Sequence, residues 1–360
     1  MAWAVPVAIA GAVVAAAVVN NGSASGATPN LPSRTAAQLI AAALGSSDTT
    51  LSGTIQESAN LGLPSLPGGH SSASLSWQTF VSGTHSARVW VDGPDKQRVA
   101  LLGELSEADV VHNGADLWTY TSDTHTVTHS TIAKDKPAAE VPSAADATPA
   151  ALAARALKAI QPGTAVSVES SQMVANRAAY TLVLRPRDAG STVQKVTIAI
   201  DAAKFVPLQV AVYGSGSAPA FRTGFTKISF STPSAAIFNF HPPAGATVSQ
   251  DPFGLSGTHG EGHGRSHAGR PDSSVRGGSA APKVLGQDWT SVVEVPAGSK
   301  GIDAALGGNT LRDLTSPVGN SGARLLHTAL LNAVILPDGR AFIGAVQPAA
   351  LEHLAATTPN

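Results

Sequence analysis

The stretch from residue 110 to residue 129, VVHNGADLWTYTSDTHTVTH, constrains the fold of this chain more than any other. Two short runs with alternating apolar residues flank Asn113-Gly114, a dipeptide that accepts the positive φ of a tight hairpin turn. After this turn Trp118 and Tyr120 stand two positions apart, so they share one face of the second strand. A further turn leads into a threonine-rich run at 124–130. The stretch therefore predicts an antiparallel meander with large aromatic groups on one side.

The composition excludes several classes of protein. Only 13% of the 360 residues are charged and the formal net charge is −1, so the chain lacks the basic surface that a nucleic-acid partner requires. Cysteine is absent, which excludes disulfides, thiol nucleophiles, cysteine-based zinc sites and the lipidated cysteine of a bacterial lipoprotein. We expect no nucleic-acid partner, no metal and no cofactor, and the length allows two domains.

The first segment, residues 1–27, has the pattern of a targeting or anchoring sequence. Residues 2–19 form an uncharged run rich in alanine and valine, and small residues follow it at 22–27. This order is typical of a secretory signal, although the first charged residue of the chain is Arg34. Three alternatives remain open: a cleaved signal peptide, a retained membrane anchor, and a buried core helix. The first two place the rest of the chain outside the cytoplasm, at the membrane or exported to the envelope.

Residues 28–250 alternate between helical and strand patterns. Thr35 and Gln38 form a capping box that starts a helix at 36–44, and Thr148 caps a second helix that Pro149 opens and that ends near residue 160. The remaining runs alternate with period two and predict about eleven antiparallel strands. The runs from which these strands can form lie at 51–57, 74–82, 87–92, 97–102, 109–112, after the turn at 113–114, 124–130, 166–171, 178–185, 193–201, 206–213 and 222–230, with 237–240 as an additional candidate.

The order of helix, meander, inserted helix and second meander resembles the LolA-like lipoprotein carriers and the related sensor RseB. The pieces that carry the resemblance are QLIAAAL, LSGTIQES, PDKQRV, HNGADLWTY and DAAKFVPLQV, within residues 35–246. The resemblance implies a mainly β (α+β) fold: a curved antiparallel half-barrel, not closed, whose concave face is covered by helices. In that family the concave face holds an apolar cavity.

The resemblance also implies a function without catalysis, namely binding of lipid or of the acyl chains of lipoproteins. The candidate cavity-lining residues are Trp90, Trp118, Tyr120, Tyr180, Leu182, Ile198, Leu208, Val210 and Phe225. The alternative for each is ordinary packing in a filled core. Period two establishes which residues share a face but not which face is concave, so Trp118 and Tyr120 can equally face outward.

The segment 251–283 interrupts the strand pattern. It is rich in glycine, serine and histidine with almost no apolar content, which predicts a flexible linker. His259, His263 and His267 recur every four residues, but the glycines between them oppose a helix, so we expect no preorganised metal site.

Residues 284–360 predict a small C-terminal α/β domain. Runs at 329–336 and 341–346 flank the turn sequence at 337–340, and a short helix is expected at 348–355. About seventy residues are marginal for independent stability, so we expect this domain to dock onto the first one. A large domain, a linker and a small domain form the layout of RseB-type proteins.

No catalytic motif supports an enzyme, since the sequence contains no G-x-S-x-G elbow, no H-E-x-x-H and no P-loop. The resulting hypothesis is an extracytoplasmic envelope protein that binds lipid or lipoprotein acyl chains. The alternative is a regulatory sensor of the RseB kind that binds an anti-sigma factor or another membrane protein.

Overall fold

The computed structural model describes residues 29–46, 50–63, 82–103, 106–132, 148–158, 160, 162–250, 282–297 and 314–358. The N-terminal segment 1–27, most of the strand expected at 74–82 and nearly all of the linker 251–283 lie outside these residues. Within the described part, the chain forms two β-sheets and three α-helices. None of these helices is long and apolar enough to cross a membrane.

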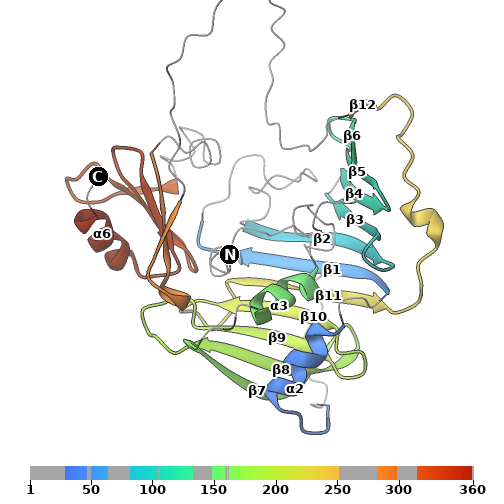
Figure 1. Cartoon of the computed structure of the whole chain (residues 1–360), viewed down its shortest axis with the longest axis horizontal. Helices are drawn as coiled ribbons and strands as arrows, with labels where there is room; N and C mark the ends of the chain where they lie inside the picture. Colours follow the sequence, from blue (N-terminus) through green and yellow to red (C-terminus); the bar gives the residue numbers. More distant parts are fainter. Residues whose placement is uncertain are drawn as a thin grey trace, which may run out of the picture.

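The large sheet has twelve strands in the order β12-β6-β5-β4-β3-β2-β1-β11-β10-β9-β8-β7. In chain order, they are β1 (Leu51–Asn60), β2 (Ser82–Val91), β3 (Lys96–Leu102), β4 (Glu107–Asn113), β5 (Asp116–Thr121), β6 (Thr126–Thr131), β7 (Thr164–Val174), β8 (Arg177–Pro186), β9 (Lys195–Asp201), β10 (Pro207–Tyr213), β11 (Phe221–Ser229) and β12 (Thr247–Gln250). The sheet is strongly curved, and its edge strands β12 and β7 stay far apart (Figure 1). The predicted unclosed half-barrel is therefore confirmed, with twelve strands where about eleven were expected.

The meander around the aromatic residues forms as predicted, with a shift of one residue at its turn. Asn113 of β4 pairs directly with Asp116 of β5, so the two turn residues are Gly114 and Ala115 rather than Asn113 and Gly114. Gly114 has a φ of +66°, which suits glycine at the first turn position, and Asn113 stays in the strand ladder.

Both helices of the large domain begin where the sequence predicts. In α2 (Ala36–Leu44), the Thr35 side chain accepts a hydrogen bond from the Gln38 N–H, and the Gln38 side chain accepts one from the Thr35 N–H. In α3 (Pro149–Lys158), the Thr148 hydroxyl oxygen accepts from the Ala151 N–H. These bonds satisfy backbone donors that have no partner inside the helix, and they fix where each helix starts.

The connection after β11 differs from the expectation. The strand predicted at 237–240 is instead a 3₁₀ turn, η4 (Ala235–Phe238), which lies against β3 and β4. Phe238 is buried there, and the Arg98 guanidinium donates a hydrogen bond to the Ile237 carbonyl. The chain then adds β12 in parallel to β6 at the sheet edge. The sequence pattern did not predict β12, because its four residues are all exposed and show no alternation.

The C-terminal domain is a six-stranded sheet in the order β13-β14-β18-β17-β16-β15. Its elements are β13 (Lys283–Leu285), η5 (Asp288–Thr290), β14 (Val292–Val295), β15 (Ser316–Pro317), β16 (Arg324–His327), β17 (Asn332–Ile335), β18 (Ala341–Gly344) and α6 (Pro348–Thr357). The predicted hairpin is confirmed, since β17 and β18 pair across residues 336–340. Helix α6 packs against these two strands and buries Leu351.

The C-terminal domain docks onto the loop between β8 and β9. The Ser191 hydroxyl and the Thr192 N–H both donate to the Ala345 carbonyl, at 3.1 and 2.9 Å, and the Thr192 hydroxyl donates to the Leu330 carbonyl at 2.6 Å. Leu330 and Ala345 also belong to the apolar core of the large domain. Docking of the small domain was expected from its size, and the two domains share both hydrogen bonds and core.

Two buried aspartates in the large sheet have pKa values shifted in opposite directions. Burial raises the pKa of Asp201, but hydrogen bonds from Arg177 and from the N–H groups of Lys204 and Ala203 outweigh it, so the pKa is lowered. Burial also raises the pKa of Asp109, and the opposing hydrogen bonds from Arg98 do not outweigh it. The two pKa shifts differ in direction because Asp201 accepts hydrogen bonds from backbone N–H groups and Asp109 accepts them only from Arg98.

We predict opposite effects of the two aspartates on acid stability. A lowered folded-state pKa contributes stability above the ordinary value of 3.8 that is lost as the pH falls further. A raised folded-state pKa has the opposite effect, because the folded state then gains stability as the pH falls. Urea unfolding of Asp201→Asn should therefore show a smaller loss of stability from pH 7 to pH 3 than the parent chain, and Asp109→Asn a larger one. Equal changes in the two variants would contradict this assignment.

Truncation of Asp201 should also be costly at neutral pH. Asp201→Ala removes the carboxylate that pairs with Arg177. Loss of one member of a fully buried ion pair costs about 3–5 kcal/mol, and because Arg177 is 30% exposed we expect a smaller loss, measured by urea unfolding at pH 7.

Candidate functional site

The strand register defines one apolar face of the large sheet. Leu182 lies opposite Ile198, and Ile198 lies opposite Val210. The same row continues through Thr223 to Glu57. We call the face that carries this row the inner face, because both helices of the large domain lie on it.

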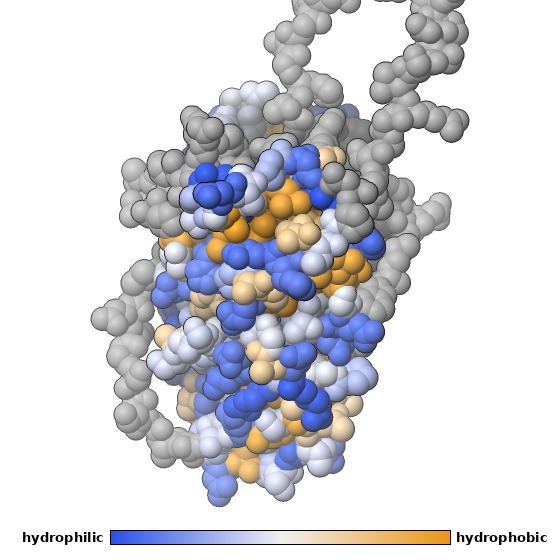
Figure 2. Space-filling model, turned by 90° about the vertical axis from the view of Figure 1, so that its left-hand side faces the viewer, coloured by the Kyte–Doolittle hydropathy of each residue, from blue (hydrophilic) through white to orange (hydrophobic). Residues whose placement is uncertain are grey.

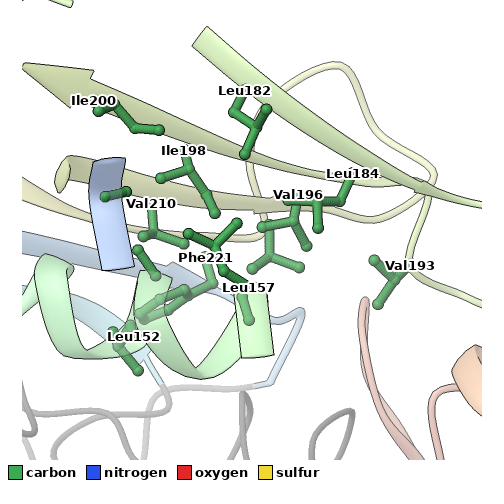
Figure 3. Close-up of a cluster of buried hydrophobic side chains, with 14 of the residues drawn as sticks. Leu152, Leu157, Leu182, Leu184, Val193, Val196, Ile198, Ile200, Val210 and Phe221 are labelled. Carbon is green, nitrogen blue, oxygen red and sulfur yellow. The ribbon is translucent and has the colours of Figure 1, made fainter. Parts of the chain in front are cut away.

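The helices fill the part of the inner face formed by β7 to β11. Leu152 and Leu157 of α3 point into the strands and meet side chains that include Ile198, Val210 and Phe221 (Figure 3). Leu39 of α2 joins the same cluster, and all of these side chains are buried. This half of the inner face is therefore a packed core, as the filled-core alternative predicts.

The apolar surface continues past the helices onto β1, β2 and β3. The residues of this continuation, which we call the β1–β3 strip, are Leu51, Ile55, Ala87, Val89 and Val99. They belong to a second cluster that also contains Phe225, which lies opposite Ile55. The main strand contacts of α2 and α3 are with β7, β10 and β11, and only Ala150, in the first turn of α3, packs against this second cluster. The body of neither helix covers the strip, yet its five side chains are buried, at 1–6% exposed.

Polar groups mark the boundaries of the strip. Glu57 and Thr223 are each 1% exposed and face one another across β1 and β11. The Thr223 hydroxyl has no hydrogen-bond partner among the described residues. An unsatisfied buried hydroxyl costs about 1–3 kcal/mol, so it is a natural acceptor or donor for a polar group brought by a ligand. Beyond β4 the same face becomes polar, with Thr119 and Thr128 in register.

The structure divides the nine predicted cavity residues into three groups. Tyr180, Leu182, Ile198 and Val210 lie in the helix-covered cluster, and Leu208 and Phe225 lie in the cluster of the strip. Trp90, Trp118 and Tyr120 lie on the opposite, outer face, because their neighbours in register are Arg98, Val111 and Asp109.

On the outer face the aromatic side chains hold the chain that leads to β12. The Trp118 ring stacks on His129 with centroids 3.9 Å apart, and His129 is bound to Asp116 at 2.7 Å. Phe240, which follows η4, packs against both Trp118 and Tyr120. These contacts explain the aromatic residues structurally. No group of three or more potential metal ligands occurs in the described part of the chain.

The sequence analysis missed most of the strip. It singled out large aromatic and aliphatic residues, whereas the strip is built from smaller ones such as Ala87 and Val89. Period-two alternation over residues 85–91 was the available signal. Thr223 gave no signal, because its importance depends on a cross-strand neighbour that is distant in sequence.

The chain was compared with known families, curated proteins and solved structures. No family model and no curated protein matches the sequence. Among solved structures, the chain is similar to the complex of MucA and MucB from Pseudomonas aeruginosa, with 13% identity over 89% of this chain and 96% of that chain and a TM-score of 0.45. A LolA superfamily protein from Nitrosomonas europaea is 12% identical over 58% of this chain and 99% of that one, with a TM-score of 0.22.

An uncharacterized conserved protein from Thermus thermophilus is 14% identical over 60% of this chain and 99% of that one, with a TM-score of 0.35. LolA-superfamily proteins and MucB are thus among the solved structures to which this chain is similar. Because these TM-scores lie below 0.5, we infer the function from the geometry of the chain itself.

If the helix-covered half is a packed core, α3 is a fixed element and not a movable lid. Leu157→Ala should then lower the free energy of unfolding by about 2–5 kcal/mol, the usual cost of truncating a fully buried leucine. Leu354→Ala, at a half-buried position of α6, is the control and should cost less. Urea unfolding measures both. A cost below about 1 kcal/mol for Leu157→Ala would show that α3 leaves the sheet easily.

Proposed function

We propose that this chain is a non-catalytic, extracytoplasmic protein that holds an acyl chain of a lipid or lipoprotein on the inner face of its half-barrel. The observation that carries the proposal is the β1–β3 strip, a buried apolar part of the inner face that extends beyond the body of both helices. Phe225 and Leu208 border the strip and complete an apolar floor. The expected apolar segment at 1–27 supports an exported or membrane-attached protein.

The energetics favour a dedicated binding surface. Removing an acyl chain from a membrane forfeits about 0.8 kcal/mol per buried methylene, or roughly 12 kcal/mol for a palmitoyl chain. A protein that moves or detects such a chain in water must replace most of this free energy with apolar contacts. The strip offers these contacts, and the buried Thr223 hydroxyl offers a partner for the polar end of the ligand.

Native mass spectrometry tests this proposal directly. The chain is produced in a host with membranes, purified without detergent, and analysed before and after organic extraction. We expect a co-purifying lipid or lipopeptide that extraction removes and that added acylated peptide replaces. A ligand-free mass that does not change on addition of acylated peptide would exclude the proposal.

A small-to-large substitution in the strip separates an open surface from a filled one. Ala87 lies opposite Ile55 and Leu101 on the inner face. If the space above it receives a ligand, Ala87→Phe should reduce lipid occupancy severalfold while the midpoint of thermal unfolding stays nearly unchanged. In a filled core the added ring would instead cost about 1–3 kcal/mol. The control Ala203→Phe adds the same ring at an exposed turn and should change neither.

The second candidate is a sensor of the RseB kind that binds an anti-sigma factor or another membrane protein. The observation that favours it is the firm docking of the C-terminal domain, since a carrier can operate with the half-barrel alone. Viewed from the side of this domain, hydrophobic side chains gather in the upper part of the molecule (Figure 2). Val284, on the edge strand β13, is 37% exposed.

Site-specific photo-crosslinking in membranes tests the sensor. A crosslinking residue at Val284 should capture one discrete membrane protein, whereas the same residue at Met173, which is 51% exposed on β7, should not. Deletion of the C-terminal domain is a poorer test, because it also exposes the core around Val193 and Val212. Equal labelling from the two positions would argue against a specific partner.

A further inference from the structure

A hollow lies on the outer face of the large sheet at one end of β8, β9 and β10, beside the loop on which the C-terminal domain docks. It is a cleft of about 850 Å³. Arg185, Lys195 and Tyr213 line its floor from three adjacent strands. Its walls are formed by residues 186–189, 191, 193, 194 and 214–217. These loops, yellow-green at the left of Figure 1, lie directly below the C-terminal domain.

The cleft carries more positive than negative charge. The lining contains three basic side chains, Arg185, Arg187 and Lys195, and one carboxylate, Asp188. Arg185 forms an ion pair with Glu169 at 2.7 Å. Arg187 and Lys195 differ from Arg185, because neither forms an ion pair within the described residues.

Other contacts hold these two cations at the cleft. The Arg187 Nε donates to the Pro162 carbonyl at 3.2 Å, and the Lys195 ammonium lies 4.7 Å from the centre of the Tyr213 ring. The Asp188 carboxylate accepts a hydrogen bond from the Gly190 N–H, which holds that carboxylate in its own loop. Two positioned cations without a carboxylate partner therefore face the same space.

We propose that this cleft binds the phosphate group of a small polar molecule. Guanidinium and ammonium groups form the strongest hydrogen bonds with phosphate oxygens, and the fork of an arginine matches two of them at once. Gln194, Ser215 and Ser217 add neutral donors to the lining. The volume falls within the range of small-molecule sites, about 300–1,000 Å³, so the ligand extends beyond a single phosphate ion.

This site is independent of the acyl-binding proposal. Arg185 and Lys195 alternate along their strands with Leu184 and Val196, which face the inner side, so the cleft and the apolar surface lie on opposite faces of one sheet. Failure of either proposal therefore leaves the other intact, and each has its own ligand and its own readout.

Isothermal titration calorimetry of the full chain with glycerol 3-phosphate and with dihexanoyl phosphatidic acid tests the site. We expect saturable binding that Arg187→Gln combined with Lys195→Gln weakens at least about tenfold, because each charge-assisted hydrogen bond contributes enough for such a loss. The matched control combines Lys204→Gln with Lys227→Gln, exposed positions at the opposite ends of the strands, and should stay within about twofold of the parent. Circular dichroism confirms that both variants fold.

The two ligands distinguish the source of the phosphate. Equal affinities would assign the site to a free phosphate ester, and tighter binding of phosphatidic acid would assign it to a lipid headgroup; both outcomes support the proposal. Absence of saturable binding of either ligand by the parent chain would overturn it. An equal loss of affinity in the control variant would overturn the proposal as well, because it would show that binding depends only on the net charge of the chain.

Discussion

The inner face of the large sheet is the constraint on which the rest of the structure depends. A sheet with one apolar face is stable only when that face is removed from water, and α2 and α3 achieve this for the part formed by β7 to β11. The chain starts in the middle of the sheet with β1, meanders outward to β6, and resumes at the opposite edge with β7. A connection between β6 and β7 must pass over the sheet, and α3 lies on that route.

The second long connection, from β11 to β12, covers part of the outer face in the same way. After β11 the chain is again beside β1, and it returns to the far edge to add β12 next to β6. On the way, η4 and Phe240 cover the outer side of β3, β4 and β5. The aromatic residues of the meander thus serve the outer connection, whereas the leucines of α3 serve the inner one. Each connection supplies the cover for the face that it crosses.

This topology explains which features the sequence could predict. Capping at Thr35 and Thr148 and the turn before Ala341 depend on near neighbours, and all of them appear as predicted. The face occupied by Trp118 depends on the path of residues more than a hundred positions later, so local period could not assign it. The same reason applies to η4 and β12, whose conformations are determined by the strands on which they dock. The β1–β3 strip could be found only once the register between β1, β2 and β11 was known.

The alternation of side chains gives the two candidate sites their independence. Along β8 and β9, Leu184 and Val196 enter the apolar core, while Arg185 and Lys195, their next neighbours, line the charged cleft. A change in one ligand therefore reaches the other face only through movement of the strands themselves. The C-terminal domain is attached to the large domain in two ways, because it binds the β8–β9 loop at Thr192 and also contributes Leu330 and Ala345 to the inner core. In the sensor that we propose as the second candidate, this attachment would transmit a movement of the strands to the C-terminal domain, whereas a carrier would not need it.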